Sequence, residues 1–498
     1  MNLPLYHGYA VMVSTFIFRF VGIGIYYSGG LFITPFIITF EVDTATAASY
    51  VSIYASLSLA SPLLCGYIQD CLNKKGYSIR LVFVFGSVME FLGIMGMSIS
   101  KSFGTVLLSS CCMGIGIGFT AFSSSGVMAQ WFPDKGVHFF FLAHAGSGIG
   151  GFSYAHVVTF LLERFHTGEE LCNLEATSPT SCQEWRPVLR CIGIFSFVAI
   201  LLASLSMRVP TLKELEEFTH DLKNVEEDRA SASSTDITLE HDSSEGKERH
   251  DRDLEISSNL ENSSVSLSQE DEKVMPLPYH LSFVQVIQTR TSILLCIWAF
   301  FNSIPIDAFY VFFPTYADSI GLSPREAGTV LSITGIAIVI GNITLAKVVN
   351  DFGYRSALLG CMAGLVVIMI VWPFCNSFGV LVALAFSVGF FTSAENIFPP
   401  FLTSTYSNLT DCILTHIGFV SAFHAPGIFL GPIIIGRIID RHGFHEAAFF
   451  CASFFAVTVI SVFLIPSKEK QMSLVVEKFD GDQKGDDIDE IRTHALKE

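Results

Sequence analysis

Long apolar runs dominate the sequence, and each is about as long as a helix that crosses a lipid bilayer. Such a helix needs ~20 mostly apolar residues. The first half supplies six runs: Gly8–Ile37, Ala48–Ile68, Leu81–Ile99, Phe103–Met128, Val137–Leu162 and Val188–Met207. The second half supplies six more: Thr291–Tyr316, Ala327–Val349, Leu358–Phe374, Gly379–Thr403, His416–Ile439 and Ala447–Ile465. The sequence therefore predicts an all-α membrane protein with twelve transmembrane helices.

Composition and charge support lipid as the surroundings of this chain. Hydrophobic residues make up 51% of it and charged residues only 15%, against about 25% charged in a typical soluble domain. The net charge of −17 arises mainly in two polar segments, between 211 and 280 and after 467, so the apolar body is close to neutral. Nothing in this pattern indicates a nucleic-acid partner.

The polar segments divide the chain. We expect a six-helix bundle over 1–208, an acidic, disordered central loop over 209–285, a second six-helix bundle over 286–466 and a charged, disordered tail over 467–498. Six helices on each side of a hydrophilic loop are typical of a duplicated transporter. With an even number of helices, both termini and the central loop lie on one side, which we expect to be the cytoplasm.

A charged turn follows the second predicted helix and recurs after the eighth. The residues are Asp70, Lys74, Lys75 and Arg80 in the first half, and Asp351 and Arg355 in the second. This turn resembles the loop signature of the major facilitator superfamily. The resemblance implies a gate in which a carboxylate contacts a neighbouring helix end and lets go when the two bundles rock. The alternative is a solvated turn with snorkelling basic side chains.

Glycine and aromatic residues of the fourth, fifth and eleventh predicted helices carry a more specific resemblance. The residues are Gly114, Gly116, the run Trp131–Lys135, Gly146, Gly148, Gly150, Gly151, Gly431, Pro432, Gly436 and Asp440. They are similar to the monocarboxylate transporter family, with fungal homologues and oxalate/formate exchangers nearest in pattern. The resemblance implies two six-helix bundles of the major facilitator fold. The glycines also suit close packing between helices.

The chain departs from that family where substrate and proton are handled. Animal members use a lysine late in the first helix and an aspartate–arginine pair in the eighth. Without gaps, the matching positions here are Leu31, Ile338 and Asn342. The resemblance therefore leaves both a monocarboxylate substrate and a proton as co-ion open.

Polar residues inside the predicted helices are the candidate site. A charge at bilayer depth costs ~2.5–3.5 kcal/mol, so these residues need a reason to be there. The expected substrate-binding residues are Arg19, Asn302, Asp307, Tyr310 and Glu395, on helices 1, 7 and 10, which line the cavity of this fold. Arg19 suits a carboxylate, because a guanidinium binds one with two parallel hydrogen bonds.

Each of these residues also has a structural interpretation. Arg19 would instead form a buried ion pair with Glu90, Asp307 or Glu395. Asp307 and Glu395 are the candidate proton sites, although Asp307 also suits a helix end at the membrane interface. The histidines within helices, His144, His156 and His424, are expected to be packed, hydrogen-bonded residues.

The sequence predicts a secondary transporter of a small organic solute, a monocarboxylate or another organic anion, that works by alternating access. A membrane receptor on the same fold, or a transporter of a non-carboxylate solute, is the alternative. No enzyme motif and no phosphate-binding loop of the P-loop type is present, and the cysteines show no metal-binding spacing, so neither catalysis nor a cofactor is expected. The expected partners are the solute, protons and the bilayer, with the plasma membrane favoured over an internal one. Cys172 and Cys182 flank a polar stretch placed outside, in an oxidising compartment, where they form a disulfide or, as the alternative, remain two free thiols.

Overall fold

The computed structural model describes residues 3–42, 44–132, 137–165, 183–211, 214, 281–322, 324–407 and 409–466. Within these ranges every regular element is a helix. The predicted disulfide, nearly all of the central loop and the tail lie outside the described residues, as does the side chain of Asp307.

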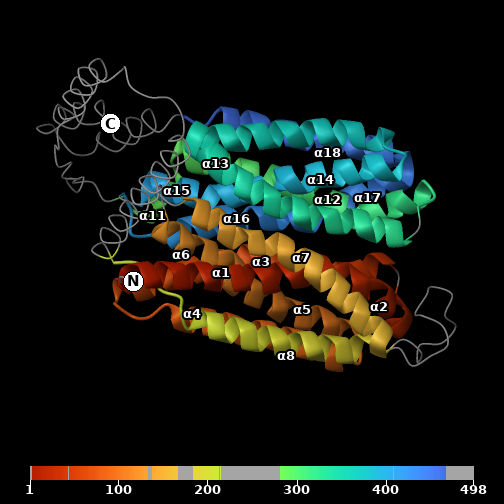
Figure 1. Cartoon of the computed structure of the whole chain (residues 1–498), viewed down its shortest axis with the longest axis horizontal. Helices are drawn as coiled ribbons and strands as arrows, with labels where there is room; N and C mark the ends of the chain where they lie inside the picture. Colours follow the sequence, from red (N-terminus) through yellow and green to blue (C-terminus); the bar gives the residue numbers. More distant parts are fainter. Residues whose placement is uncertain are drawn as a thin grey trace, which may run out of the picture.

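The first half of the chain forms one bundle, drawn from red to yellow in Figure 1. Its helices are α1 (Leu3–Ser28), α2 (Ile33–Phe40), α3 (Thr44–Lys74), α4 (Arg80–Ile99), α5 (Phe103–Ile117), α6 (Ser123–Trp131), α7 (Val137–Phe165) and α8 (Trp185–Ser204). A π-helical turn, Gly118–Phe122, joins α5 to α6 without a break. The two therefore form one span, which is the predicted fourth helix.

The second half forms the other bundle, drawn from green to blue. Its helices are α11 (Phe283–Ile287), α12 (Arg290–Ser319), α13 (Pro324–Val371), α14 (Phe378–Thr392), α15 (Phe398–Tyr406), α16 (Ile413–Ala422), α17 (His424–His442) and α18 (Phe444–Phe463). A 3-10 turn, Ser393–Ile397, joins α14 to α15. The 48 residues of α13 contain two spans, because the chain turns at Gly353, where φ is 79° and ψ is 163°.

The twelve predicted spans are confirmed. Ten segments of the described chain are long and apolar enough to cross a membrane, and one of them, Ser332–Phe374, contains the bend at Gly353 and counts as two. The twelfth span is α7, which has 29 residues. Its histidines, serines and glycines lower its hydropathy, so length and packing identify it better than apolarity does.

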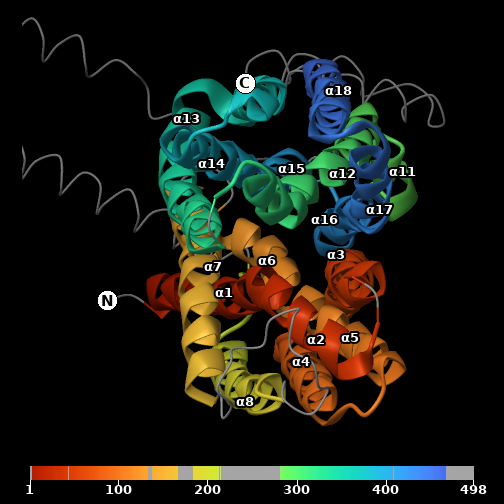
Figure 2. The same cartoon turned by 90° about the vertical axis from the view of Figure 1, so that its right-hand side faces the viewer.

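The two bundles lie side by side, as the end-on view in Figure 2 shows. Contacts between them are concentrated in two helix pairs, α3 with α16 and α7 with α13. At the second pair, Gly148 of α7 lies so close to the carbonyl oxygen of Gly335 in α13 that a side chain at Gly148 would overlap it. Gly146 and Gly150 lie equally close to the backbone of α1, at Phe16 and Phe20. This confirms the close helix packing predicted for the glycines of the fifth helix, within the first bundle and, at Gly148, between the bundles.

Helix α3 continues past its predicted end at Ile68 and stops at Lys74. Asp70 and Lys74 are therefore in its last turns rather than in a loop. Gly76, with φ at 72°, ends the helix, because the amides of Gly76 and Tyr77 bond back to the carbonyls of Asn73 and Leu72 at 3.0 and 2.9 Å. This glycine-based C-terminal cap fixes the end of α3. It therefore keeps Asp70 and Lys74 helical, next to the second bundle.

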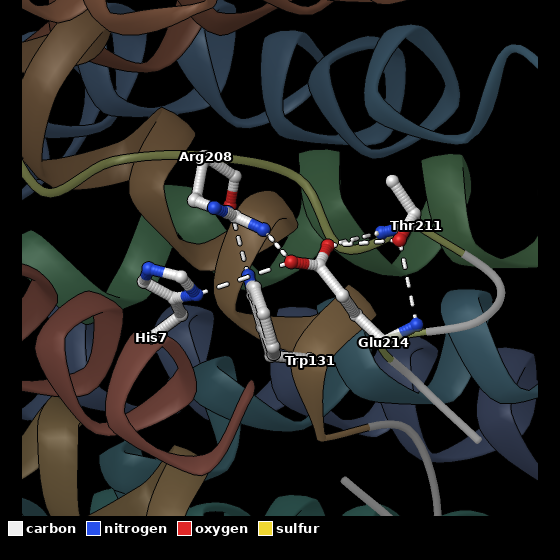
Figure 3. Close-up of polar contacts among 5 residues, drawn as sticks. All are labelled: His7, Trp131, Arg208, Thr211 and Glu214. Atoms are coloured by element: carbon white, nitrogen blue, oxygen red, sulfur yellow. Dashed lines mark hydrogen bonds and ion pairs between the residues drawn. The ribbon is translucent and has the colours of Figure 1, made fainter. Parts of the chain in front are cut away.

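A polar cluster fastens the start of the central segment to the first bundle (Figure 3). Glu214 forms an ion pair with Arg208 and accepts hydrogen bonds from the amide and hydroxyl of Thr211 at 3.0 and 2.9 Å. His7 of α1 lies 3.9 Å from the same carboxylate, and the indole of Trp131 donates to the Arg208 carbonyl at 2.8 Å. Burial lowers the pKa of Arg208, and the nearby charge of Arg80 lowers it further. The cluster joins the ends of α1, α6 and α8.

Candidate functional site

A cavity lies between the two bundles near the middle of the molecule. The cavity has a volume of about 100 Å³. One water needs about 10–15 Å³, so the cavity is large enough for several waters or one small solute. Its polar lining comes from both halves of the chain: Arg19, Ser125, Tyr310, Glu395, Asn396 and His424.

Arg19 is the positive charge of this cavity. It lies on α1, is only 7% exposed, and donates from Nη2 to the hydroxyl of Ser125 on α6. That hydroxyl is 3.0 Å from Nε2 of His144, and the guanidinium carbon lies 5.1 Å from the ring centre of Phe122. Ser125 and Phe122 therefore hold the guanidinium in place. The Nε atom is buried without a hydrogen-bond partner among the residues that the structure describes, so its N–H group donates to none of them.

Arg19 forms no ion pair with any acid among the described residues, since the ion pairs of 4 Å or less there involve other side chains. Glu90, one of its predicted structural partners, lies on α4 inside the first bundle, where Thr120 donates to it at 3.4 Å. Glu395 lines the same cavity as Arg19, on the side of the second bundle. Arg19 therefore has no direct counter-ion among the described acids.

Glu395 supplies the negative charge. It lies in the 3-10 turn between α14 and α15, and its Oε1 atom accepts a hydrogen bond of 2.9 Å from the amide of Asn302 on α12. Asn302 is fully buried. Beside this pair, the amide of Asn396 donates to Asn342 of α13 at 3.0 Å. The amide of Asn302 therefore holds the acid at the cavity wall.

The structure brings three of the five predicted substrate-binding residues to the cavity: Arg19, Tyr310 and Glu395. Asn302 is not part of the cavity lining. It lies behind Glu395 and donates a hydrogen bond to it. Asp307 lies on α12, with its side chain outside the description. Ser125 was not predicted, because serine is common in helices, and the only signal was its position on a cavity-lining span.

Two of the family's coupling positions also lie in or next to this region. Ile338 lines the cavity, and Asn342 pairs with Asn396 beside it. Leu31 instead lies in the turn after α1 and is 38% exposed. The cavity therefore has an apolar side chain where the family's acid would be, and its charges come from Arg19 and Glu395.

The predicted gate residue Asp70 contacts the opposite bundle directly. Its Oδ2 atom accepts hydrogen bonds from the amide of Thr415 at 2.7 Å and from its hydroxyl at 2.5 Å. Asp70 is 5% exposed and Thr415 is 4% exposed. Thr415 is in the first turn of α16, where unpaired amides favour a negative charge. Nearby, Lys74 lies 3.9 Å from Asp411, with both side chains about half exposed.

The remaining predicted gate residues make no such contact. Lys75 and Arg80 are exposed. In the second half, Asp351 is exposed and has no side-chain bond partner among the described residues, while Arg355 donates to the carbonyl of Phe463 at 2.6 Å within its own bundle. The repeated turn is thus asymmetric, since only the first-half acid bridges the bundles. Among described residues, no three His, Cys, Asp or Glu side chains come close enough to hold a metal ion.

Comparison with known proteins decides the family. The model of the Major Facilitator Superfamily matches residues 10–249 and 295–493. The chain belongs to this superfamily. The chain is 22% identical over 430 residues to monocarboxylate transporter 12 of Rattus norvegicus, covering 85% of this chain and 78% of that protein. To the Homo sapiens protein of the same name it is 24% identical over 434 residues, covering 85% and 73%.

Solved structures agree with the fold. The chain resembles the proton:xylose symporter XylE with a TM-score of 0.60 and 12% identity, over 94% of this chain and 99% of that one. It resembles FucP in the outward conformation with a TM-score of 0.60 and 15% identity, over 92% and 99%. For the human organic anion transporter MFSD10, the TM-score is 0.56 and the identity 14%, over 93% and 100%.

These findings confirm the predicted fold class and the resemblance to monocarboxylate transporters. The similar proteins are transporters rather than enzymes. The chain is therefore a multi-pass integral membrane transporter of this superfamily.

Proposed function

We propose that this transporter moves a small organic solute bearing a carboxylate, by alternating access, and that Arg19 binds the carboxylate. One observation carries the proposal: a guanidinium, 93% buried, lines the central cavity without an acid in ion-pair contact among the described residues. A buried charge is costly unless it is paired. An anionic solute would supply the missing partner.

The surroundings of Arg19 support this role. The Ser125 hydroxyl and the ring of Phe122 fix the guanidinium, and its Nε atom bonds to no described residue. A preorganised fork loses little entropy when it binds a planar carboxylate. The names of the relatives, monocarboxylate transporter and organic anion transporter, agree with an anionic group.

The other predicted site residues receive roles in the same proposal. Glu395, held by Asn302, and Tyr310 would contact the rest of the solute, while Asp307 stays a candidate on α12. Asp70 would gate the side of the membrane that carries the N-terminus, where it joins the bundles through Thr415. The first-half gate would also include Lys74, Lys75 and Arg80. Its counterpart in the second half would consist of Asp351 and Arg355. We propose the cytoplasm for this side and the plasma membrane as the location.

Proton symport is the second candidate, and Glu395 is the observation that favours it. It is the acid of the described cavity lining, and a carboxyl group in a transport pathway is a common proton carrier. Uptake into proteoliposomes under an imposed proton gradient tests this coupling.

The test of the carboxylate anchor measures folded yield and initial uptake together for Arg19→Met and Arg19→Lys. We expect normal folded yield and lost uptake for Arg19→Met, and weak uptake for Arg19→Lys, because an ammonium cannot form the planar two-bond contact. Normal uptake per folded molecule in both variants would refute the anchor. Solute binding to the wild type without any uptake would instead favour the receptor interpretation.

A further inference from the structure

A buried polar network lies inside the second bundle, behind the contact that Asp70 makes with this bundle. Nε2 of His416, on α16, is 2.7 Å from the hydroxyl of Ser292 on α12. The hydroxyl of Thr289, just before α12, is 2.9 Å from that of Ser292 and 2.7 Å from that of Tyr406 on α15. The four side chains of the network are at most 4% exposed. The network therefore joins the first turn of α16 to α12 and α15.

Two neighbouring residues of α16 face different bundles. Successive side chains of a helix point ~100° apart. Thr415 faces α3 of the first bundle, where its amide and hydroxyl donate to Asp70. His416 instead faces α12 and α15, and its ring centre lies 5.1 Å from that of Tyr406. The same helical turn is therefore bonded to the opposite bundle on one side and to its own bundle on the other.

The hydrogen bonds indicate which ring nitrogen of His416 carries the proton. The hydroxyl of Ser292 donates to the carbonyl oxygen of Val286 at 2.9 Å, so its oxygen accepts from Nε2–H of the imidazole. Nδ1 is buried and has no hydrogen-bond partner among the described residues, and a buried N–H group without an acceptor is costly. His416 is therefore a neutral ring that donates through Nε2.

Helices α3 and α16 pack closely across the bundle interface (Figure 2). A side chain at Gly66 of α3 would overlap the carbonyl oxygen of Leu414, and one at Gly418 of α16 would overlap that of Pro62. Because the two backbones are this close, a shift of the first turn of α16 would either overlap α3 or break the hydrogen bonds to Asp70. The position of this turn therefore decides whether the gate contact forms.

We propose that His416 is a positioning residue of the gate, whose hydrogen bond to Ser292 holds the first turn of α16 where Thr415 can donate to Asp70. This inference rests on the proposed role of Asp70 as a gate, and it adds a residue that acts on this gate from within the second bundle. His416 is not part of the cavity lining, so its role is separate from solute binding. Without a donor at this position, the turn loses its bond to α12, and the conformation in which Asp70 contacts Thr415 becomes less populated.

The experiment measures the distance between spin labels at the exposed positions Tyr77 and Phe352, one in each bundle. It uses the purified full-length protein without solute, in a background without reactive cysteines. The measured quantity is the ratio of molecules at the shorter distance to those at the longer distance. It should fall about fivefold or more in His416→Leu and in Ser292→Ala, because a buried hydrogen bond is lost. His416→Gln, whose amide can donate to Ser292 in place of the ring, should keep the ratio within about twofold of the parent.

A double-mutant cycle with Asp70 separates positioning from a general structural role. Asp70→Ala removes the contact that His416 positions, and it should shift the ratio toward the longer distance by itself. In the Asp70→Ala background, His416→Leu and Ser292→Ala should each change the ratio less than about twofold, because residues that act through one contact are not additive. A residue that only stabilises the second bundle would have the same effect in both backgrounds.

Ser461→Ala is the matched control for Ser292→Ala. Ser461 lies on α18, is 4% exposed and donates within its own helix to the carbonyl oxygen of Val457 at 2.9 Å. Its substitution should leave the ratio unchanged. Gel filtration reveals whether each variant folds, and Ser292→Ala carries the test if His416→Leu does not fold.

The outcomes separate this inference from the proposed function. An unchanged ratio in His416→Leu and Ser292→Ala, together with a shift in Asp70→Ala, would overturn the positioning role and leave the gate standing. Equal effects in both backgrounds, or an equal effect of Ser461→Ala, would also overturn the positioning role. No shift in Asp70→Ala would overturn the gate and this inference together. Because no solute is present, none of these results depends on Arg19 as the carboxylate anchor.

Discussion

The contact between Asp70 and Thr415 should set the balance between the conformations of this transporter. We consider Asp70→Asn, which keeps the shape of the side chain and removes its charge. In the structure the carboxylate accepts two hydrogen bonds, at 2.7 and 2.5 Å, from one residue of the other bundle. Both residues are almost completely buried, so solvent screens the interaction little.

The size of the effect follows from the difference between charged and neutral hydrogen bonds. A bond to a charged group contributes about 1.5–3 kcal/mol and a neutral one about 0.5–1.5 kcal/mol. We call the conformation in which Asp70 contacts Thr415 the closed state. Loss of the charge on both hydrogen bonds therefore destabilises this state by roughly 2–3 kcal/mol. Because 1.4 kcal/mol is a tenfold change, the ratio of closed to open molecules should fall roughly 30- to 150-fold.

Spin labels on the two bundles measure this shift as a change in their distance distribution. Tyr77 and Phe352 are suitable positions, because they are 64% and 70% exposed and lie in the turns after the second and eighth spans. The labels go into a background without reactive cysteines. We expect one main distance in the parent and a second, longer distance in Asp70→Asn.

The matched control is Asp411→Asn, which breaks the exposed pair between Lys74 and Asp411. Surface pairs contribute only about 0–1 kcal/mol, so the populations should change less than about fivefold. An unchanged distance distribution in Asp70→Asn would refute the reasoning, and so would an equal effect of both variants.

The remaining predictions concern the segments that connect the helices. Glu214→Gln should weaken the cluster of Figure 3 by about 1–2 kcal/mol, because Glu214 bonds both Arg208 and Thr211; faster proteolysis of the central segment with unchanged folding of the bundles is the expected result, and unchanged cleavage would contradict it. Ser244→Cys should resist impermeant thiol reagents in intact cells and react after permeabilisation; labelling of intact cells would reverse the topology. Cys172 and Cys182 should form a disulfide contributing on the order of 2–3 kcal/mol; finding both thiols alkylated without reductant would exclude it.

The number of spans was predictable because bilayer thickness fixes the length of an apolar run. The bend at Gly353 falls in the charged turn that the sequence predicted between Val349 and Leu358, and its positive φ divides α13 into two spans. The ends of the helices were harder to place. Helix α3 runs beyond its predicted end because nothing between Ile68 and Lys74 stops a helix, and Gly76 does.

The candidate site was predictable from its charges but not from its neighbours. Arg19 and Glu395 are conspicuous, since charges within apolar spans are rare. Ser125 was not, because its side-chain direction depends on the π-turn Gly118–Phe122, which adds a residue to one turn and rotates the face of α6. The partner of Asp70 is Thr415, 345 positions away, and no local spacing reveals such a contact.

Backbone contact between α7 and α13 has a consequence for the speed of transport. Gly148 and Gly335 have no side chains, so the two helix backbones meet directly at this point, flanked by the side chains of Val339 and Phe152. Interlocking side chains would have to separate and repack at each turnover, whereas two bare backbones can pivot against each other. This contact therefore holds the two bundles together with few side chains that must repack. We expect it to keep the energy barrier between the orientations of the bundles low. A methyl group at Gly148 would overlap the carbonyl oxygen of Gly335, so it would push α7 and α13 apart and disturb the contact about which the bundles turn.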